Sequence, residues 1–316
     1  MKKKDSNVTV LKKRSTVSYA KYGYIFSIPF VLAFLIFSLY PTLYTAILGF
    51  TNLRGVGKTN FKFLALDKFF SNYEYIIFKN PTFRIALLNT FKIWICNFIP
   101  QMILALLLAA WFTNRRVKVP GEGAFKVLFY MPNIITAATV AILFRALFGY
   151  PMGPINDMFE TFGWISEPYQ FFQNKWIARG VVAFIQFWQW YGYTMIVLIS
   201  GILGINPELF EASEIDGATS AQTFFYVTLP NLRTIMIFTL ITSLIGGLQM
   251  FDIPKLLTPS GDGEPDFATR TITMYMRSTA FTGSRNMGLA SASSIILFAV
   301  TLIFSLILFY VMRDKD

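Results

Sequence analysis

The chain of 316 residues contains no histidine and only one cysteine, Cys96. Without histidine it cannot form a Ser-His-Asp or Cys-His nucleophilic site, and the usual metal sites built from His and Cys are also excluded. A single cysteine cannot form an intrachain disulfide framework. The carboxylates of the loops show no convergence that would indicate acid–base chemistry. The sequence therefore predicts no catalytic site and no metal site.

Charged residues are also scarce, at 14% of the chain, whereas soluble domains carry about 25%. Hydrophobic residues make up 54% and aromatic residues 17%, and a helix needs about 20 apolar residues to cross a bilayer. Six runs approach or reach that length, and they lie at Tyr24–Ala46, Ile93–Phe112, Val127–Phe144, Val181–Ile205, Ile235–Phe251 and Leu289–Met312. We therefore expect an all-α integral membrane protein with six transmembrane helices.

Positive charges, which give a net charge of +11, flank these runs. Residues 1–21 form a basic tail that contains Lys2, Lys3, Lys4, Lys12, Lys13, Arg14 and Lys21. Cytoplasmic flanks of membrane helices are enriched in Lys and Arg, so this tail is expected to be cytoplasmic, and six spans would place both termini there. The loop after the second run is also basic and supports this orientation. The first external loop, within residues 51–82, is basic as well, which weakens the argument for the orientation. Anionic lipid is a better partner for these charges than nucleic acid, because no basic stripe is interleaved with aromatics.

The first run is too long for a signal peptide and lacks a cleavage site of small residues. Residues 22–82 are therefore expected to hold an uncleaved first membrane helix followed by an external loop. One motif in that loop, Gly55-Val56-Gly57-Lys58-Thr59, resembles the end of a phosphate-binding loop. The motif requires a further glycine where the chain has Asn52, and it follows a membrane span rather than a strand. We expect no nucleotide site there.

A polar segment, EASEIDGATSAQTFFYVTLP at residues 211–230, separates two apolar runs. Asn206 and Pro207 suit the cap and the first turn of a short helix. Glu208 and Glu211 would lie near the positive end of that helix. The segment is thus expected to begin with a short helix that projects from the membrane surface.

A second short helix is expected after a break at Gly217. Thr219 and Gln222 have the spacing of a capping box, and Pro230 is expected to stop the helix. Two short helices joined by a turn would form a projection that another protein can hold.

This segment closely resembles the EAA loop of the membrane subunits of bacterial binding-protein-dependent ABC importers. The matching residues are Glu211, Ala212, Asp216, Gly217, Ala218, Val227, Leu229 and Pro230, while Ser213 replaces the second alanine of the pattern. The resemblance implies a type I ABC importer fold and a coupling loop at residues 207–230 that docks on an ATPase. The coupling residues that it implies are Glu208, Glu211, Ala212, Ser213, Asp216, Gly217, Ala218, Leu229 and Pro230.

Weaker motifs over residues 83–312 resemble the permease core of carbohydrate importers, closest to the larger permease of maltose and multiple-sugar systems. They are Leu88-Asn89-Thr90, Tyr130-Met131-Pro132, Gly153-Pro154-Ile155-Asn156, Phe251-Asp252 with Leu257-Thr258, and Gly288-Leu289-Ala290-Ser291-Ala292. The Gly-Gly-Pro that usually follows the Leu-Thr is replaced by Gly261-Asp262-Gly263-Glu264-Pro265.

The resemblance implies a multi-pass protein of the bacterial cytoplasmic membrane that works with several partners. These are a second permease in a heterodimer, two copies of an ATPase subunit that uses ATP and Mg, an extracytoplasmic sugar-binding protein, and membrane lipid. The chain itself would bind no cofactor. The external stretches 252–287, rich in turn formers, and 150–175 are the first and second candidates for contact with the binding protein.

Candidate sugar-binding residues lie in the fourth and fifth runs. By position relative to the EAA loop, Gln189, Trp190 and Tyr193 resemble the sugar-contacting part of the maltose system, and Ser243, Gly247 and Gln249 are the counterparts in the fifth run. Aromatic and amide side chains suit sugars because rings stack on pyranose faces while amides bond hydroxyls. Interfacial belts and helix packing are the alternative role for the same residue types.

Three alternative functions remain open at this point. An ABC permease for peptides or amino acids is the nearest, although the Asn89-Thr90 and Phe251-Asp252 motifs favour carbohydrate. A secondary sugar carrier would usually place a coupling carboxylate within a span, and Asp252 lies at the end of one. A membrane-bound enzyme would need a catalytic cluster, and none is visible.

Overall fold

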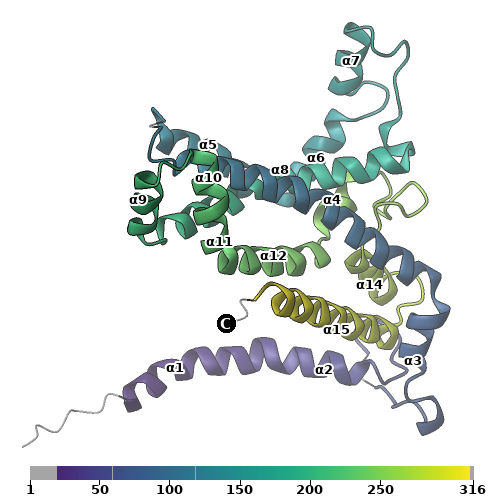
Figure 1. Ribbon diagram of the computed structural model, residues 1–316. Coiled ribbons are helices and arrows are strands. Elements are labelled where there is room, and N and C mark those ends of the chain that lie inside the picture. Colours follow the sequence, from purple (N-terminus) through teal and green to yellow (C-terminus); the bar gives the residue numbers. More distant parts are fainter. Residues whose placement is uncertain (1–19, 59, 118, 314–316) are drawn as a thin grey trace, which may run out of the picture. The chain divides into compact units, whose positions relative to one another are not determined.

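The computed structural model describes residues 20–58, 60–117 and 119–313, which form helices joined by loops (Figure 1). Within these ranges the extended pairing is limited to two isolated bridges, Thr51 with Phe63 and Arg54 with Asn286. The predicted all-α class is confirmed. The chain divides into two units, the first ending at Ile47 and the second beginning at Leu48. Residues 1–19 of the basic tail predicted at 1–21 lie outside the described residues, and its last two residues, Ala20 and Lys21, already belong to the first helix.

The first unit contains a long apolar helix built from α1 (Ala20–Phe34), the π-helical segment η1 (Leu35–Leu39) and α2 (Tyr40–Leu48). The π segment has a local cause, because Pro41 lacks the N–H that would continue the ladder. Just before that proline, the Tyr40 N–H donates to the carbonyl of Leu35. The helix is long and apolar enough to cross a membrane, as predicted for the first run.

The second unit holds four more helices of that kind. They are α4 (Pro81–Phe112), α8 (Lys175–Leu203), the interrupted pair α12 (Arg233–Leu248) with α13 (Asp252–Leu257), and α15 (Met287–Met312). The shorter elements are η2 (Leu66–Lys68), α3 (Ser71–Glu74), η3 (Tyr75–Lys79), α5 (Glu122–Ile134), α6 (Ala137–Leu147), α7 (Pro154–Thr161), η4 (Phe171–Gln173), α9 (Pro207–Ile215), α10 (Ser220–Thr223), η5 (Phe224–Thr228), α11 (Leu229–Asn231) and α14 (Ile272–Phe281).

The third apolar run does not form one continuous helix. It breaks at Ile135 and Thr136, and α5 and α6 meet there at 88°. Pro132 removes a hydrogen bond from the last turn of α5, and the Thr136 side chain starts α6 by accepting from the N–H of Thr139 at 3.3 Å. Hydrophobicity alone does not detect this break, because the apolar run continues through it. Counted as one broken span, the pair brings the candidate spans in the described residues to six.

Helices α4 and α8 pack along each other and form the centre of the second unit. At one end Ala105, Ala109 and Phe112 of α4 contact Met195 and other residues of α8. Association in lipid depends on close packing rather than on removal of apolar surface from water. Gly192 shows this, because a Cβ atom there would overlap the backbone of Phe129 on α5.

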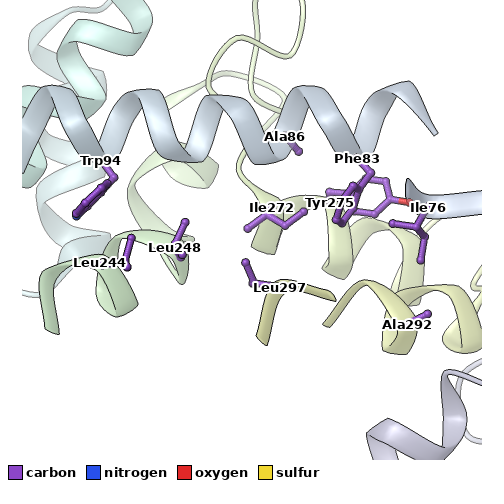
Figure 2. Packing of buried hydrophobic residues seen from close by; sticks show 10 residues of the cluster. All are labelled: Ile76, Phe83, Ala86, Trp94, Leu244, Leu248, Ile272, Tyr275, Ala292 and Leu297. Carbon is purple, nitrogen blue, oxygen red and sulfur yellow. The ribbon is translucent and has the colours of Figure 1, made fainter. Parts of the chain in front are cut away.

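A second core joins α4 to the C-terminal helices (Figure 2). Trp94 lies beside Leu244 and Leu248 of α12, while Phe83 lies against Tyr275 of α14 with ring centroids 5.6 Å apart. Burial raises the pKa of the Tyr275 phenol, whose oxygen accepts a 2.7 Å hydrogen bond from the Asn80 amide. The same Asn80 caps α4 by accepting from the N–H of Phe83 at 3.0 Å. This cap explains why the helix begins at Pro81 rather than at Ile93, where the apolar run begins.

The predicted external stretches are more ordered than their turn-rich sequences suggest. Residues 252–287 contain α13 and α14, and residues 150–175 contain α7 and η4. Aromatic residues of the 51–82 stretch also pack, with the ring of Phe69 stacked on that of Phe50 at 4.6 Å and the ring of Phe70 at 5.7 Å from it.

Candidate functional site

The middle of α8 presents polar and aromatic side chains on one face. Gln186, Gln189, Trp190 and Tyr193 are spaced by three, four and seven residues, so they follow one side of the helix. Trp190 and Tyr193 retain 45% and 38% of their surface exposure, and their rings meet edge to face at 5.8 Å. These two large side chains lie in the middle of a long helix and stay exposed, so a ligand can contact them.

The end of α12 forms the opposite wall. Ser243 accepts a 3.2 Å hydrogen bond from the indole N–H of Trp94 on α4. Gly247 lies directly against that indole, because a Cβ atom there would overlap the Trp94 ring. The helix then ends, and the chain passes through Gln249 to the start of α13 at Asp252. Gly247 therefore permits α12 to approach α4 at the level of these polar groups.

The break between α5 and α6 closes a third side. The Gln189 amide donates to the carbonyl of Ile135 at 3.1 Å, which satisfies a backbone group left unpaired by the break. Gln189 is only 5% exposed. Its amide N–H₂ thus supports the wall of the site.

These elements surround one cavity of about 630 Å³. All six predicted sugar-contacting residues line it, namely Gln189, Trp190, Tyr193, Ser243, Gly247 and Gln249. Their binding of sugar stays a prediction, but the structure does bring them together.

Sequence reasoning missed the contribution of α4. Trp94, Asn97 and Gln101 also line the cavity, at intervals of three and four residues. Asn97 and Gln101 are 5% and 3% exposed, and the Gln101 amide donates to the Thr194 hydroxyl at 2.8 Å. The available signal was a pair of amides inside an apolar run, on the same helical face as a tryptophan.

The predicted coupling segment forms two short helices, as its caps indicate. The Asn206 side chain accepts from the N–H of Glu208 at 3.1 Å and starts α9. Gly217 makes the turn with φ of +71°, and no atom lies within 4 Å of where its Cβ would be. The glycine is therefore required by backbone conformation and not by crowding. Thr219 and Gln222 form the capping box of α10, with bonds of 2.7 and 3.3 Å.

The expected stop at Pro230 is wrong. The chain stays helical through η5 and α11 to Asn231, and the ladder breaks at Leu232 before α12. The Leu229 N–H donates to the carbonyl of Phe224, five residues back, just before the proline. A π-helical turn thus accommodates Pro230 in the same way as the turn before Pro41, because widening the turn relieves the clash of the proline ring.

The other predicted coupling residues differ in burial. Glu208, Glu211, Ala212, Asp216 and Pro230 are exposed, and Ala218 and Leu229 are half-buried. Ser213 is 8% exposed, and its hydroxyl donates to the Phe210 carbonyl at 2.7 Å. It also lies 3.3 Å from the Thr223 hydroxyl. Ser213 therefore joins α9 to α10, whereas the exposed residues form the free surface.

Two arginines after α4 contact this segment, which the sequence reading did not anticipate. Arg115 lies 3.9 Å from the Glu211 carboxylate and 5.1 Å from the centre of the Phe210 ring. Arg116 donates to the carbonyl of Ala218 at 2.6 Å, next to the Gly217 turn. Both members of the Arg115–Glu211 pair are largely exposed, at 44% and 64%. Such a pair contributes about 0–1 kcal/mol, so Glu211 remains accessible to another protein.

Comparison with known proteins identifies the family. The sequence profile of the family described as binding-protein-dependent transport system inner membrane component matches residues 83–315. The chain is 28% identical over 295 residues to the lactose transport system permease protein LacF of Rhizobium radiobacter, covering 93% of this chain and 94% of that protein. It is 30% identical over 285 residues to the arabinooligosaccharides transport system permease protein AraP of Bacillus subtilis, covering 90% and 86%.

The fold also matches that of a chain in a solved bacterial ABC transporter for the acidic polysaccharide alginate. The TM-score is 0.75 at 24% identity, with 93% of this chain and 95% of that chain covered. A second solved structure of an alginate transporter, in complex with a periplasmic protein bound to an alginate pentasaccharide, matches with a TM-score of 0.74 at 23% identity, covering 93% and 94%. At these identities the likeness establishes the fold, which is that of an ABC importer permease. The chain is a multi-pass integral membrane protein that belongs to the family of inner membrane components of binding-protein-dependent transport systems.

Proposed function

We propose that this chain is the transmembrane permease subunit of an ATP-driven importer of oligosaccharides. The observation that carries the proposal is the cavity between α4, α8, α12 and the α5–α6 break. Its wall combines aromatic rings with amide and hydroxyl groups, which suits the apolar faces and the hydroxyl edges of sugars. The names of the lactose and arabinooligosaccharide relatives support the same class of solute. Family membership argues against the secondary-carrier alternative.

Membership of the family supports a proposal for the partners. A second permease would complete the translocation path, and an extracytoplasmic sugar-binding protein would deliver the substrate. The solved complex of an alginate importer with its periplasmic protein supports a binding protein as a partner. Two ATPase subunits would bind ATP and Mg, and the six spans would place both termini in the cytoplasm of a bacterial cell.

Coupling would run through α9 and the Gly217 turn. The exposed surface around Glu211 would dock in a cleft on an ATPase subunit, and closure of the two ATPases would pull on it. Short hydrogen bonds within the segment, including those of Ser213 and the Thr219–Gln222 box, make it stiff enough to transmit displacement. The spans attached to it would then switch the cavity from one side of the membrane to the other.

A transport assay tests the proposal. A strain that lacks this chain should lose uptake of one of a panel of labelled oligosaccharides, and the wild-type chain should restore it only while ATP is available. Glu211→Lys reverses the charge of the docking surface and should abolish uptake while the protein stays in the membrane. If the restored solute is a peptide or an amino acid, or if uptake survives without ATP, the proposal is wrong.

A further inference from the structure

The cavity has an unusual charge balance. Among the described residues that line it, Asp252 is the only one whose side chain is charged at neutral pH, and no Lys or Arg takes part. The remaining polar groups are neutral amides, hydroxyls and a phenol. The binding site that this chain contributes is therefore negative.

Asp252 is placed where a ligand can meet its carboxylate. It is the first residue of α13, directly after the interruption in the fifth span, and its side chain is exposed. Within the described residues it takes part in none of the ion pairs. Two cations belong to neighbouring positions, but neither lines the cavity: the Arg277 guanidinium lies 5.1 Å from the centre of the Phe251 ring, and the Lys255 ammonium donates to the Gly261 carbonyl.

The neutral groups of the wall cannot replace a cation. Recognition of a carboxylate in a protein relies on Arg or Lys, or on several backbone N–H groups aimed at one point. Here the Gln101 and Gln189 amide N–H₂ groups already donate to Thr194 and to the Ile135 carbonyl. The Asn133, Gln186 and Gln249 amides add neutral donors, but the described part of the wall offers no cation to offset the Asp252 charge, so bringing a sugar carboxylate into this cavity would be costly.

We propose that this site accepts neutral or cationic saccharides and discriminates against saccharides that carry a carboxylate, with Asp252 as the specificity-determining residue. The inference rests on the proposed function and narrows its substrate class. A chain of similar fold belongs to an importer of alginate, an acidic polysaccharide, so the fold by itself does not set this preference. Like charges about 8 Å apart at a protein-like dielectric lower affinity roughly thirtyfold. We expect at least about tenfold discrimination, which salt should weaken.

Direct binding to the assembled importer tests this without selection by the binding protein. The complex of both permeases and the ATPases is reconstituted in nanodiscs, and titrations at low ionic strength follow the fluorescence of the tryptophans that line the cavity. The probes are the neutral disaccharides lactose, cellobiose, maltose and arabinobiose, the acidic digalacturonate and cellobiouronate, and the cationic, unacetylated chitobiose. Neutral and cationic probes should bind at least about tenfold more tightly than the acidic ones.

Variants isolate the role of Asp252. Asp252→Asn should reduce the preference for neutral over acidic probes by about tenfold, while Asp252→Glu should keep it. Asp67→Asn removes an exposed carboxylate of η2, outside the cavity, and should change nothing. The ratio of acidic to neutral sugar uptake in cells, normalised to the amount of each variant in the membrane, gives a second readout.

The outcomes separate this inference from the proposed function. Equal binding of acidic and neutral probes to the wild-type complex, or an unchanged preference in Asp252→Asn, overturns the inference even if oligosaccharide uptake is normal. If the Asp252→Asn complex does not assemble, the variant Gln249→Lys is used instead. It adds a cation to the same wall and should shift the preference toward the acidic probes. An unchanged preference in Gln249→Lys also overturns the inference. Loss of the chain without any loss of oligosaccharide uptake contradicts the proposed function instead.

Discussion

The two ends of α4 and α8 are held to their neighbouring segments in different ways. At one end Asn89 of α4 and Arg179 of α8 bind the loop between α13 and α14. Arg179 donates to the Ala268 carbonyl and to the Asn89 side chain, both at 2.8 Å, and Asn89 donates to the Phe267 carbonyl at 2.7 Å. At the other end, the contacts of Arg115 and Arg116 with the coupling segment lie at the surface.

Burial explains the different strengths of the two attachments. Asn89 is 2% exposed, and buried hydrogen bonds to a charged group contribute about 1.5–3 kcal/mol each. The loop that they hold contains Asp266 and Phe267 with φ of +51° and +56°, a left-handed conformation that is unfavourable for these residues and persists only when neighbours enforce it. The exposed Arg115–Glu211 pair contributes far less. We infer that the first end is rigid, whereas the coupling end is stiff internally but only weakly attached.

The largest expected effect comes from the turn of the coupling segment. Gly217→Val forces a β-branched residue into φ of +71° and should abolish uptake without removing the protein from the membrane. Because no atom crowds the position, the loss would report backbone conformation alone. Gly180→Ala, at a similarly open position in α8, is the control and should transport normally. Normal uptake by Gly217→Val would contradict the proposed coupling role of this turn.

The rigid end should lose stability when its amide is removed. Asn89→Ala deletes two hydrogen bonds and leaves the Phe267 carbonyl unpaired, which should cost about 2–3 kcal/mol. Thermal unfolding of the purified complex measures this loss, and protease cleavage within residues 258–271 locates it. Asn52→Ala removes an exposed asparagine and should have little effect on either measurement. If the two variants unfold alike, the contrast between the ends disappears.

A smaller effect is expected in the cavity between the two ends. Trp190→Ala removes a ring that is 45% exposed, so it should weaken sugar affinity about tenfold, as expected for loss of an aromatic contact. Stability should change little because the ring is not part of a core. Trp190→Phe keeps a stacking surface and should recover most of the affinity. A drop in unfolding temperature without a change in sugar affinity would instead assign Trp190 to packing.

The smallest effect is expected at the exposed ion pair. Arg115→Gln removes the 3.9 Å contact with Glu211 and should lower stability by no more than about 0.5 kcal/mol. Uptake should stay within about twofold of wild type, because a free-energy change of about 0.5 kcal/mol alters an affinity or a rate by only about that factor. Measuring both at low and at high salt checks the cause, because screening should erase even this difference. A loss comparable to that of Asn89→Ala would show that both ends are rigid.

The coupling segment was the most predictable part of the molecule from sequence. Its caps at Asn206 and Thr219 and its turn at Gly217 depend on residues within a few positions of one another, so local rules sufficed. Pro230 was the exception. A proline usually ends a helix, but a π turn absorbed it here.

The cavity was predictable in part. Six lining residues, on α8, on α12 and directly after α12, were identified by position, whereas those of α4 were not. Which face of an apolar helix meets its neighbours depends on close packing between segments that are far apart in the sequence. The approach of Gly247 to Trp94 is one such contact.

The amino-acid sequence by itself determined the class of the protein, the apolar spans and the short coupling helices. Each of these follows from composition or from interactions between near neighbours in the chain. Only the tertiary structure decided the 88° break in the third span, the attachment of the α13–α14 loop by Arg179, and the place of Asp252 as the one charged residue among the described residues that line the cavity. These features depend on contacts between segments that are distant in the sequence, and the pattern of residue types does not show which distant residue a given side chain will contact.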